Sequence, residues 1–357
     1  SLALLFLLYE LVGVITNLIG GWVTSFYGIK RMLSLGVLLQ IFGLCLLSFY
    51  TSSWGLYSSI IWIMIAQGIS GIAKDISKTS SKSAVKIVSG DGNGLLFKWV
   101  SWFTGLKNIS KGLGFFFGSL LIEIIGFHYS LYTLILLLSL CLFSLILLES
   151  NLGLLKPSKT LKTFLSKSSN INTLSLARLF LFGSRDIWFV VGLPLFLYSA
   201  GWSFWQVGSF IALWIIGYGF CQSFIPVLIK RSNDGLSLEV SSAKFWIFML
   251  GVIQTALLVL LAISNHNISA EKILTFGLII YGGVFAVNSA LHSYLILAYS
   301  NKNSVAEDIG FYYSSNALGR FFGTFLSGYL YQKYGIEGCV FGSLCFIFVS
   351  FFVLKRL

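Results

Sequence analysis

The chain has 357 residues, of which 57% are hydrophobic and 10% are charged. A water-soluble globule of this size needs more polar surface than that, so the composition excludes a soluble domain and indicates an integral membrane protein. The 24 lysines and arginines outnumber the 12 acidic residues, which leaves a formal net charge of +12.

Apolar runs close to the twenty or so residues that a helix needs to cross a bilayer recur along the whole chain. We count eleven, so the sequence predicts an all-α membrane protein. Longer connections lie at 75–100, 149–173 and 230–244. The predicted spans are residues 2–25, 32–50, 55–74, 101–125, 130–148, 174–199, 204–229, 245–264, 273–298, 309–331 and 336–354.

The basic residues predict the orientation, because lysine and arginine in short loops stay on the cytoplasmic side. When alternate loops are assigned to two sides, seventeen basic residues fall on one side and only two, Lys272 and Lys333, on the other. This bias predicts a multi-pass protein of the plasma (inner) membrane with a cytoplasmic C-terminus. The remaining five basic residues lie inside apparent spans: Lys107, Lys111, Arg178, Arg185 and Arg320.

An odd number of spans with a cytoplasmic C-terminus puts Ser1 at the outer face, so we expect one further helix upstream and a parent of twelve. Twelve helices with a basic central loop predict two six-helix halves. Residues 1–148 would hold helices 2–6 of the parent, 149–173 the cytoplasmic central loop, and 174–357 helices 7–12.

Internal similarity between the two halves agrees with this division. A shift of 209 residues carries segment 111–126 onto segment 320–335. The shift aligns Lys111 with Arg320 and Gly126 with Gly335, so a basic residue recurs at the same position of both repeats.

Two short motifs resemble those of the major facilitator superfamily. The stretch GGWVTSFYGIKR at 20–31 resembles its loop signature, although Ser25 stands at the acidic position; the matching residues are Gly21, Gly28, Lys30 and Arg31. The stretch IMIAQGISG at 63–71 resembles the fourth-helix motif at Gln67 and Gly68, with Met64 where that motif has an arginine. The resemblance implies a transporter with the two-half helical fold of that superfamily.

A closer resemblance, along nearly the whole chain, is to the ArsJ-type organoarsenical efflux permeases. It is carried by the segments at 71–86, 96–116, 177–197 and 204–219. The resemblance implies export of 1-arseno-3-phosphoglycerate, which forms in the cytosol when a glycolytic dehydrogenase uses arsenate in place of phosphate. It therefore implies arsenate resistance and a functional partnership with a glyceraldehyde-3-phosphate dehydrogenase. We expect a monomer in the lipid bilayer that binds no nucleic acid.

Such a substrate is strongly anionic, and a carrier for it needs cations inside the membrane, where cations mostly face a polar cavity or a partner. Lys107 and Lys111 lie one turn apart on one face of a helix, and Arg320 lies at the equivalent depth of the other repeat. An arginine fork can bind a phosphate or arsenate group through two hydrogen bonds. We expect Lys107, Lys111, Arg320 and Arg185 to bind the substrate.

The alternative is that these cations pair with the carboxylates inside apparent spans, which are Glu10, Glu123 and Asp186. Glu10 and Asp186 are also the candidates for proton coupling, because a carboxyl group in low dielectric holds its proton more tightly. Arg178 is expected near the cytoplasmic end of its span, where it could extend to the interface.

The segment GIAKDISKTSSKSAVK at 71–86 places lysines four residues apart, on one slowly turning face of a helix. One interpretation is topological: the lysines keep this loop inside and contact anionic lipid headgroups. The other is that Lys74 and Lys78 line a cytoplasmic funnel that concentrates an anionic substrate, while Lys82 and Lys86 only meet lipid.

Two other classes of function remain open. A transporter of the same fold could export another organic phosphate, another anion or a drug. A membrane enzyme would need an acid pair, a metal-binding cluster or a nucleophile with its base, and the sequence has no such pattern. The five cysteines are scattered without metal-ligand spacing, so we expect neither a metal site nor a cofactor.

Overall fold

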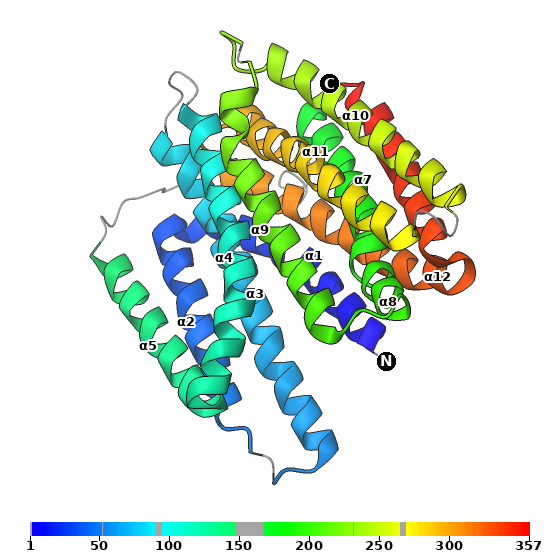
Figure 1. Ribbon diagram of the computed structural model, residues 1–357. Coiled ribbons are helices and arrows are strands. Elements are labelled where there is room, and N and C mark those ends of the chain that lie inside the picture. The colour runs from blue at the N-terminus through cyan, green and yellow to red at the C-terminus, as the bar shows by residue number, and fades with distance from the viewer. Residues whose placement is uncertain (1, 52, 90–94, 148–166, 231, 265–268) are drawn as a thin grey trace.

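The computed structural model describes the whole chain except residues 1, 52, 90–94, 148–166, 231 and 265–268. Every regular element in the described part is an α-helix (Figure 1). Lys156, Lys159, Lys162 and most of the predicted central loop lie outside the described residues. The helices are α1 (Leu2–Tyr27), α2 (Ile29–Ser48), α3 (Leu56–Ser89), α4 (Leu95–Ile125), α5 (Phe127–Ile146), α7 (Ser169–Phe189), α8 (Gly192–Ser199), α9 (Phe204–Leu228), α10 (Ser237–Ala262), α11 (Ala270–Tyr299) and α12 (Val305–Leu354).

The number of membrane spans is close to the prediction but does not confirm it. In the described part of the chain, nine helical segments are long and apolar enough to cross a bilayer, and α1 is not among them. The longest, α12, has 50 residues and joins two helices across Gly335, which would make ten. The fold is therefore an all-helical membrane fold with about nine to ten candidate spans, and the predicted eleven are not confirmed.

Helix α3 continues far beyond the predicted span at 55–74. It has 34 residues and ends at Ser89, so the lysines at 74–86 belong to one continuous helix. No glycine or proline stands between Ile72 and Ser89, and polar residues alone do not end a helix. At 1.5 Å per residue, α3 is roughly 50 Å long, which exceeds the hydrocarbon core of a bilayer.

The internal repeat appears in the backbone as a matching turn. Gly126 separates α4 from α5 with a φ of 81°, and its aligned residue Gly335 interrupts α12 with a φ of 63°. These are backbone conformations that glycine adopts without steric cost. Both repeats therefore reverse the chain direction at the same aligned glycine.

The helices divide into groups that meet along a few long contacts. In Figure 1, α2 and α5 lie on one side of the molecule, whereas α10, α11 and α12 lie on the other. Helix α7 packs most extensively along α12, α1 also packs along α12, and α4 packs along α9. The pairs α1–α12 and α4–α9 join residues 2–147 to residues 167–357.

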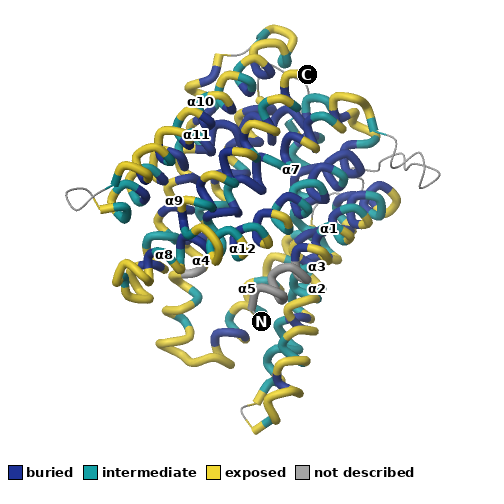
Figure 2. Tube along the Cα trace, turned by 90° about the vertical axis from the view of Figure 1, so that its right-hand side faces the viewer, coloured by how far each residue is buried: buried dark blue, intermediate teal, exposed yellow. Residues whose placement is uncertain are grey.

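Burial is uneven along the molecule (Figure 2). Helices α7, α11 and the first half of α12 contain many of the buried residues. The start of α3 is instead open, with Leu56 72% and Tyr57 83% exposed. Apolar side chains exposed in this way suit contact with lipid tails rather than water.

One end of the molecule is closed by contacts between helix ends, and we call it the lysine-rich end because Lys30, Lys86, Lys98, Lys167 and Lys355 stand at helix ends there. The hydroxyl of Ser25, near the end of α1, donates to Glu307 Oε1 at 3.1 Å, near the start of α12. Lys167 Nζ lies 3.1 Å from Asp308 Oδ1 and 3.5 Å from Glu307 Oε2. Ser25 occupies the position expected to be acidic, and Glu307 supplies a carboxylate there from the facing helix.

Helices α1 and α12 approach so closely at this end that their backbones touch. A Cβ atom added to Gly21 would lie 2.7 Å from the carbonyl oxygen of Ala306 and 2.8 Å from the Cα of Gly310. Both contacts are with backbone atoms, which cannot rotate away as a side chain can. Glycine is therefore required at this crossing for the end to close.

We expect Gly21→Val to separate α1 from α12 and to destabilise the closed end by about 1–3 kcal/mol, the usual cost of overpacking. The thermal midpoint of the purified protein should fall. The matched control is Gly20→Ala, since a Cβ at that neighbouring glycine would meet only Ile76 Cγ1 at an ordinary 3.6 Å. Equal midpoints for the two variants would contradict the assignment.

Candidate functional site

A cavity of about 540 Å³ lies between six helices. Its lining residues come from α3, α4, α7, α9, α11 and α12, and thus from both sides of the α1–α12 and α4–α9 contacts. Seven of the described lining residues are cations, whereas Asp75 is the one carboxylate among them. The cations are Lys74, Lys78, Lys107, Lys111, Arg178, Arg185 and Arg320.

Helical spacing places these cations on the faces that line the cavity. Lys107 and Lys111 are four residues apart near the middle of α4, and the polar residues Thr104 and Asn108 share that face. Arg178 and Arg185 are seven residues apart on α7, which also puts them on one face. The structure therefore brings all four predicted substrate-binding residues, Lys107, Lys111, Arg185 and Arg320, to one cavity.

Lys74 and Lys78 line the same cavity, rather than a separate funnel below it. They lie just past the middle of α3 because that helix is longer than predicted. Lys78 Nζ forms an ion pair with Asp75 Oδ1 at 2.8 Å and lies 4.3 Å from the ring centre of Tyr313.

The prediction that Lys82 and Lys86 only meet lipid is wrong. Lys82 is completely buried and Lys86 is 6% exposed. The spacing of four residues correctly indicates a common helix face, but this face turns inward against the protein as α3 approaches the lysine-rich end.

Arg320 is held by carboxylates from two other helices. Its Nη2 lies 2.6 Å from Oε1 of Glu10 on α1, and its Nε donates to Oδ2 of Asp186 on α7 at 3.1 Å. Arg185 Nε donates to the other oxygen of Asp186 at 2.7 Å. The alternative of pairing with an acid inside the spans is therefore realised for Arg320 and Arg185.

Three cations of the cavity have no carboxylate partner among the described residues. Lys107 and Lys111 form neither a hydrogen bond nor an ion pair within that part of the chain. Arg178 Nε donates to the amide oxygen of Asn316 at 3.0 Å, and its guanidinium lies 3.6 Å from the ring centre of Phe182. These three residues give the cavity an uncompensated positive charge.

Arg178 is the cavity residue that the sequence reasoning placed elsewhere. It was expected near the end of its span, but α7 begins at Ser169, five residues before the predicted start, and Arg178 is only 5% exposed. Its spacing of seven residues from Arg185 was the signal that could have placed it on the cavity face.

The sequence analysis did not foresee the neutral polar residues around Arg178. Gln222 accepts a hydrogen bond from Asn108 at 2.7 Å and donates one to Ser289 at 3.3 Å.

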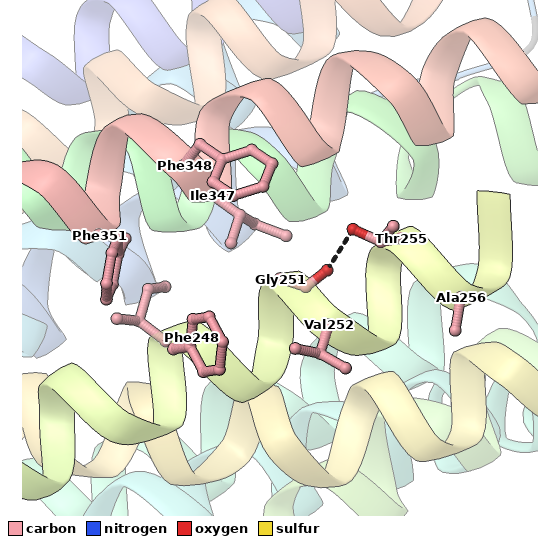
Figure 3. Close-up of a pocket in the computed structure, with 9 residues that line it drawn as sticks. Phe248, Gly251, Val252, Thr255, Ala256, Ile347, Phe348 and Phe351 are labelled. Carbon is pink, nitrogen blue, oxygen red and sulfur yellow. Dashed lines mark hydrogen bonds between the residues drawn. The ribbon is translucent and has the colours of Figure 1, made fainter. Parts of the chain in front are cut away.

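A second hollow, between α10 and the end of α12, has a different character (Figure 3). It is lined by apolar side chains such as Phe248, Ile347 and Phe351. Thr255 is the polar side chain among the lining residues, and its hydroxyl donates to the carbonyl oxygen of Gly251 at 2.8 Å. A hollow of this kind suits a lipid tail and offers nothing that binds an anion.

Residues 1–282 match the Major Facilitator Superfamily, and the chain belongs to that family. It is a multi-pass membrane transporter of a small molecule, in a family of transporters rather than enzymes. No curated protein matches the chain.

Solved structures agree on the fold. The human organic anion transporter MFSD10 (TETRAN) superposes with a TM-score of 0.76 and 15% identity, over 99% of this chain and 83% of that chain. A bacterial homologue of the iron transporter ferroportin, in the outward-facing state, has a TM-score of 0.77 at 15% identity, over 99% and 89%. FucP in the outward conformation has a TM-score of 0.75 at 11% identity, over 100% and 90%.

The aligned pair Lys111 and Arg320 should respond differently to the same substitution. We expect Arg320→Met to lower membrane abundance and the thermal midpoint, because it leaves Glu10 and Asp186 without their shared partner. The cost should be about 1–3 kcal/mol, at the lower end because Arg320 is partly open to the cavity. Lys111→Met, which strands no carboxylate, should keep both quantities near normal. Equal stability of the two variants would show that the ion pairs do not support the fold.

Proposed function

We propose that this transporter exports a small organic anion that carries phosphate or arsenate charge. The observation that carries the proposal is the positive charge of Lys107, Lys111 and Arg178, which line one intramembrane cavity without a carboxylate partner among the described residues. A cation inside the membrane is costly unless it faces a polar cavity or a partner, and a bound anion would supply the missing partner. A neutral drug would not.

Within this class, the substrate that fits the family resemblance is 1-arseno-3-phosphoglycerate. That molecule has an anionic group at each end and a three-carbon body, so it could contact two clusters of cations at once. The lysines of α4 suit one end as point charges, while Arg178 offers a planar fork for the other. The proposal includes a functional partnership with a glyceraldehyde-3-phosphate dehydrogenase, which would form the substrate in the cytosol.

In this proposal Arg185 and Arg320 bind the substrate only after their carboxylate partners release them. Both are held by Asp186, and Arg320 also by Glu10, so they become available to an anion only when these carboxylates release them. Protonation of Glu10 or Asp186 would do so, which keeps both residues as the candidates for proton coupling. The monomeric state and the two halves at 1–148 and 174–357 remain part of the proposal.

Support from the fold neighbours is limited to the fold. One of them is an organic anion transporter, but at 15% identity the likeness says nothing about substrate. Export of another organic phosphate is the alternative that the cavity charge permits equally well.

The first test is arsenate resistance in cells that lack their own arsenic pumps. Expression of the protein together with the dehydrogenase should raise arsenate resistance and lower cell arsenic, and should leave arsenite resistance unchanged. Lys107→Met and Lys111→Met should each abolish the gain at normal abundance, since each removes one charge-assisted contact worth about 1.5–3 kcal/mol. The control is Lys333→Met, because Lys333 is exposed, does not line the cavity and lies 4.9 Å from the ring centre of Tyr329. Protection against arsenite alone would point to a different substrate.

The second test concerns orientation, which is a prediction from the basic residues. A reporter fused after Leu357 should be active in the cytoplasm, because the C-terminal Lys355 and Arg356 belong to the lysine-rich end. A reporter active only outside the cell would reverse the proposed direction of transport.

A further inference from the structure

Lys82 is a completely buried cation that does not line the proposed cavity. It lies on α3 one turn beyond Lys78, on the side of the lysine-rich end. Just beyond the cavity, the hydroxyls of Ser80 and Thr24 lie 3.4 Å apart and join α3 to α1. Lys82 therefore stands between the cavity and the contacts that close this end.

The ammonium group of Lys82 has no hydrogen-bond partner in the described part of the chain. Its nearest aromatic rings are those of Tyr313 and Tyr312, at 5.2 and 5.4 Å from the ring centres. Contacts this long are worth only a fraction of a hydrogen bond to a charged acceptor. Two cations of the cavity stand near it and would repel it: Lys78 lies one turn earlier on α3, and Arg178 lies 5.1 Å from the ring centre of Tyr312.

A second unpartnered group, His292, lies on α11 one turn beyond Ser289, and Arg178 Nη1 donates to the hydroxyl of that serine at 3.5 Å. His292 is completely buried, and neither of its ring nitrogens has a hydrogen-bond partner among the described residues. Unsatisfied buried groups are rare in native structures and call for a physical reason.

The missing partner must be rich in acceptors. Lys82 offers three donors and His292 offers one or two. Arg178 has further guanidinium hydrogens, and its Cζ lies 5.1 Å from the ring centre of Tyr312, the ring that Lys82 also approaches. No carboxylate of the described residues forms an ion pair with Lys82 or His292. An oxyanion would satisfy donors from α3, α7 and α11 together.

We propose that Lys82 and His292 form a second anion subsite next to Arg178 of the cavity, and that an oxyanion occupies this subsite when the lysine-rich end is open. The subsite takes one compact phosphate, arsenate or carboxylate group. This inference rests on the proposed export of an organic anion and adds the step by which the anion passes from the lysine-rich end to the cavity. In the closed conformation Tyr312 and Tyr313 cover Lys82, so the ammonium is left without its ligand.

The test compares uptake of radiolabelled 3-phosphoglycerate, a stable phosphorylated carboxylate, into everted and right-side-out membrane vesicles. These two preparations expose opposite faces of the full chain, and the C-terminal reporter shows which of them exposes the lysine-rich end. For entry from that end, Lys82→Met should raise KM at least about tenfold, the loss expected for one charge-assisted contact. For entry from the opposite face, KM should change less than about twofold. Lys82→Arg, which keeps the charge, should stay close to the wild type from both faces.

The control variant is Lys98→Met, an exposed lysine of the same end that lies against Trp102 at 5.7 Å. Its KM should equal that of the wild type from both faces. A Lys82→Met protein that behaves like this control, or that loses affinity equally from both faces, overturns the subsite while the wild type still carries the probe. A wild type that carries no 3-phosphoglycerate from either face overturns the proposed function, and the subsite with it.

Discussion

The cost of burying positive charge in a membrane is the constraint on which the rest of this site depends. Cations line the cavity in excess, and the nearby acids Glu10, Asp75 and Asp186 are too few to neutralise them. Two of these acids, Glu10 and Asp186, form ion pairs with Arg320 and Arg185. The cavity thereby divides into a paired part, which contributes to stability, and an unpaired part, which only a ligand can satisfy.

The paired part also connects the cavity to the rest of the fold. Glu10 belongs to α1 and Arg320 to α12, and these two helices cross backbone to backbone at the lysine-rich end. An anion that enters the cavity competes with Glu10 and Asp186 for the same guanidinium. Substrate binding would therefore weaken a contact between the two sides of the molecule, which is the kind of differential interaction that a conformational change requires.

The sequence predicted the class of fold and most of the cations that line the cavity, but it could not predict how the charges pair. Composition identifies the membrane protein, and the aligned Lys111 and Arg320 identify both sides of the cavity. Pairing depends on which helices become neighbours: Arg320 meets Glu10 across 310 positions of sequence, and Ser25 meets Glu307 across 282. Spacing likewise placed the four lysines of α3 on one face, but whether that face meets lipid or protein depends on packing that no local pattern encodes.

A route for the proposed anion can be inferred from the order of these charges along α3. The face that begins with buried Lys82 continues through Lys78 to Lys74, the last two of which line the cavity. An anion that enters at the C-terminal end of α3 would meet Lys82 first of these three lysines, and successive ammonium groups would then follow at intervals of one turn, roughly 6 Å. Because a row of neighbouring sites lets a charged ligand move on without a single deep trap, the stripe suits passage better than tight binding. The cluster of Lys107, Lys111 and Arg178 at its inner end offers a denser set of donors, so the anion would rest there.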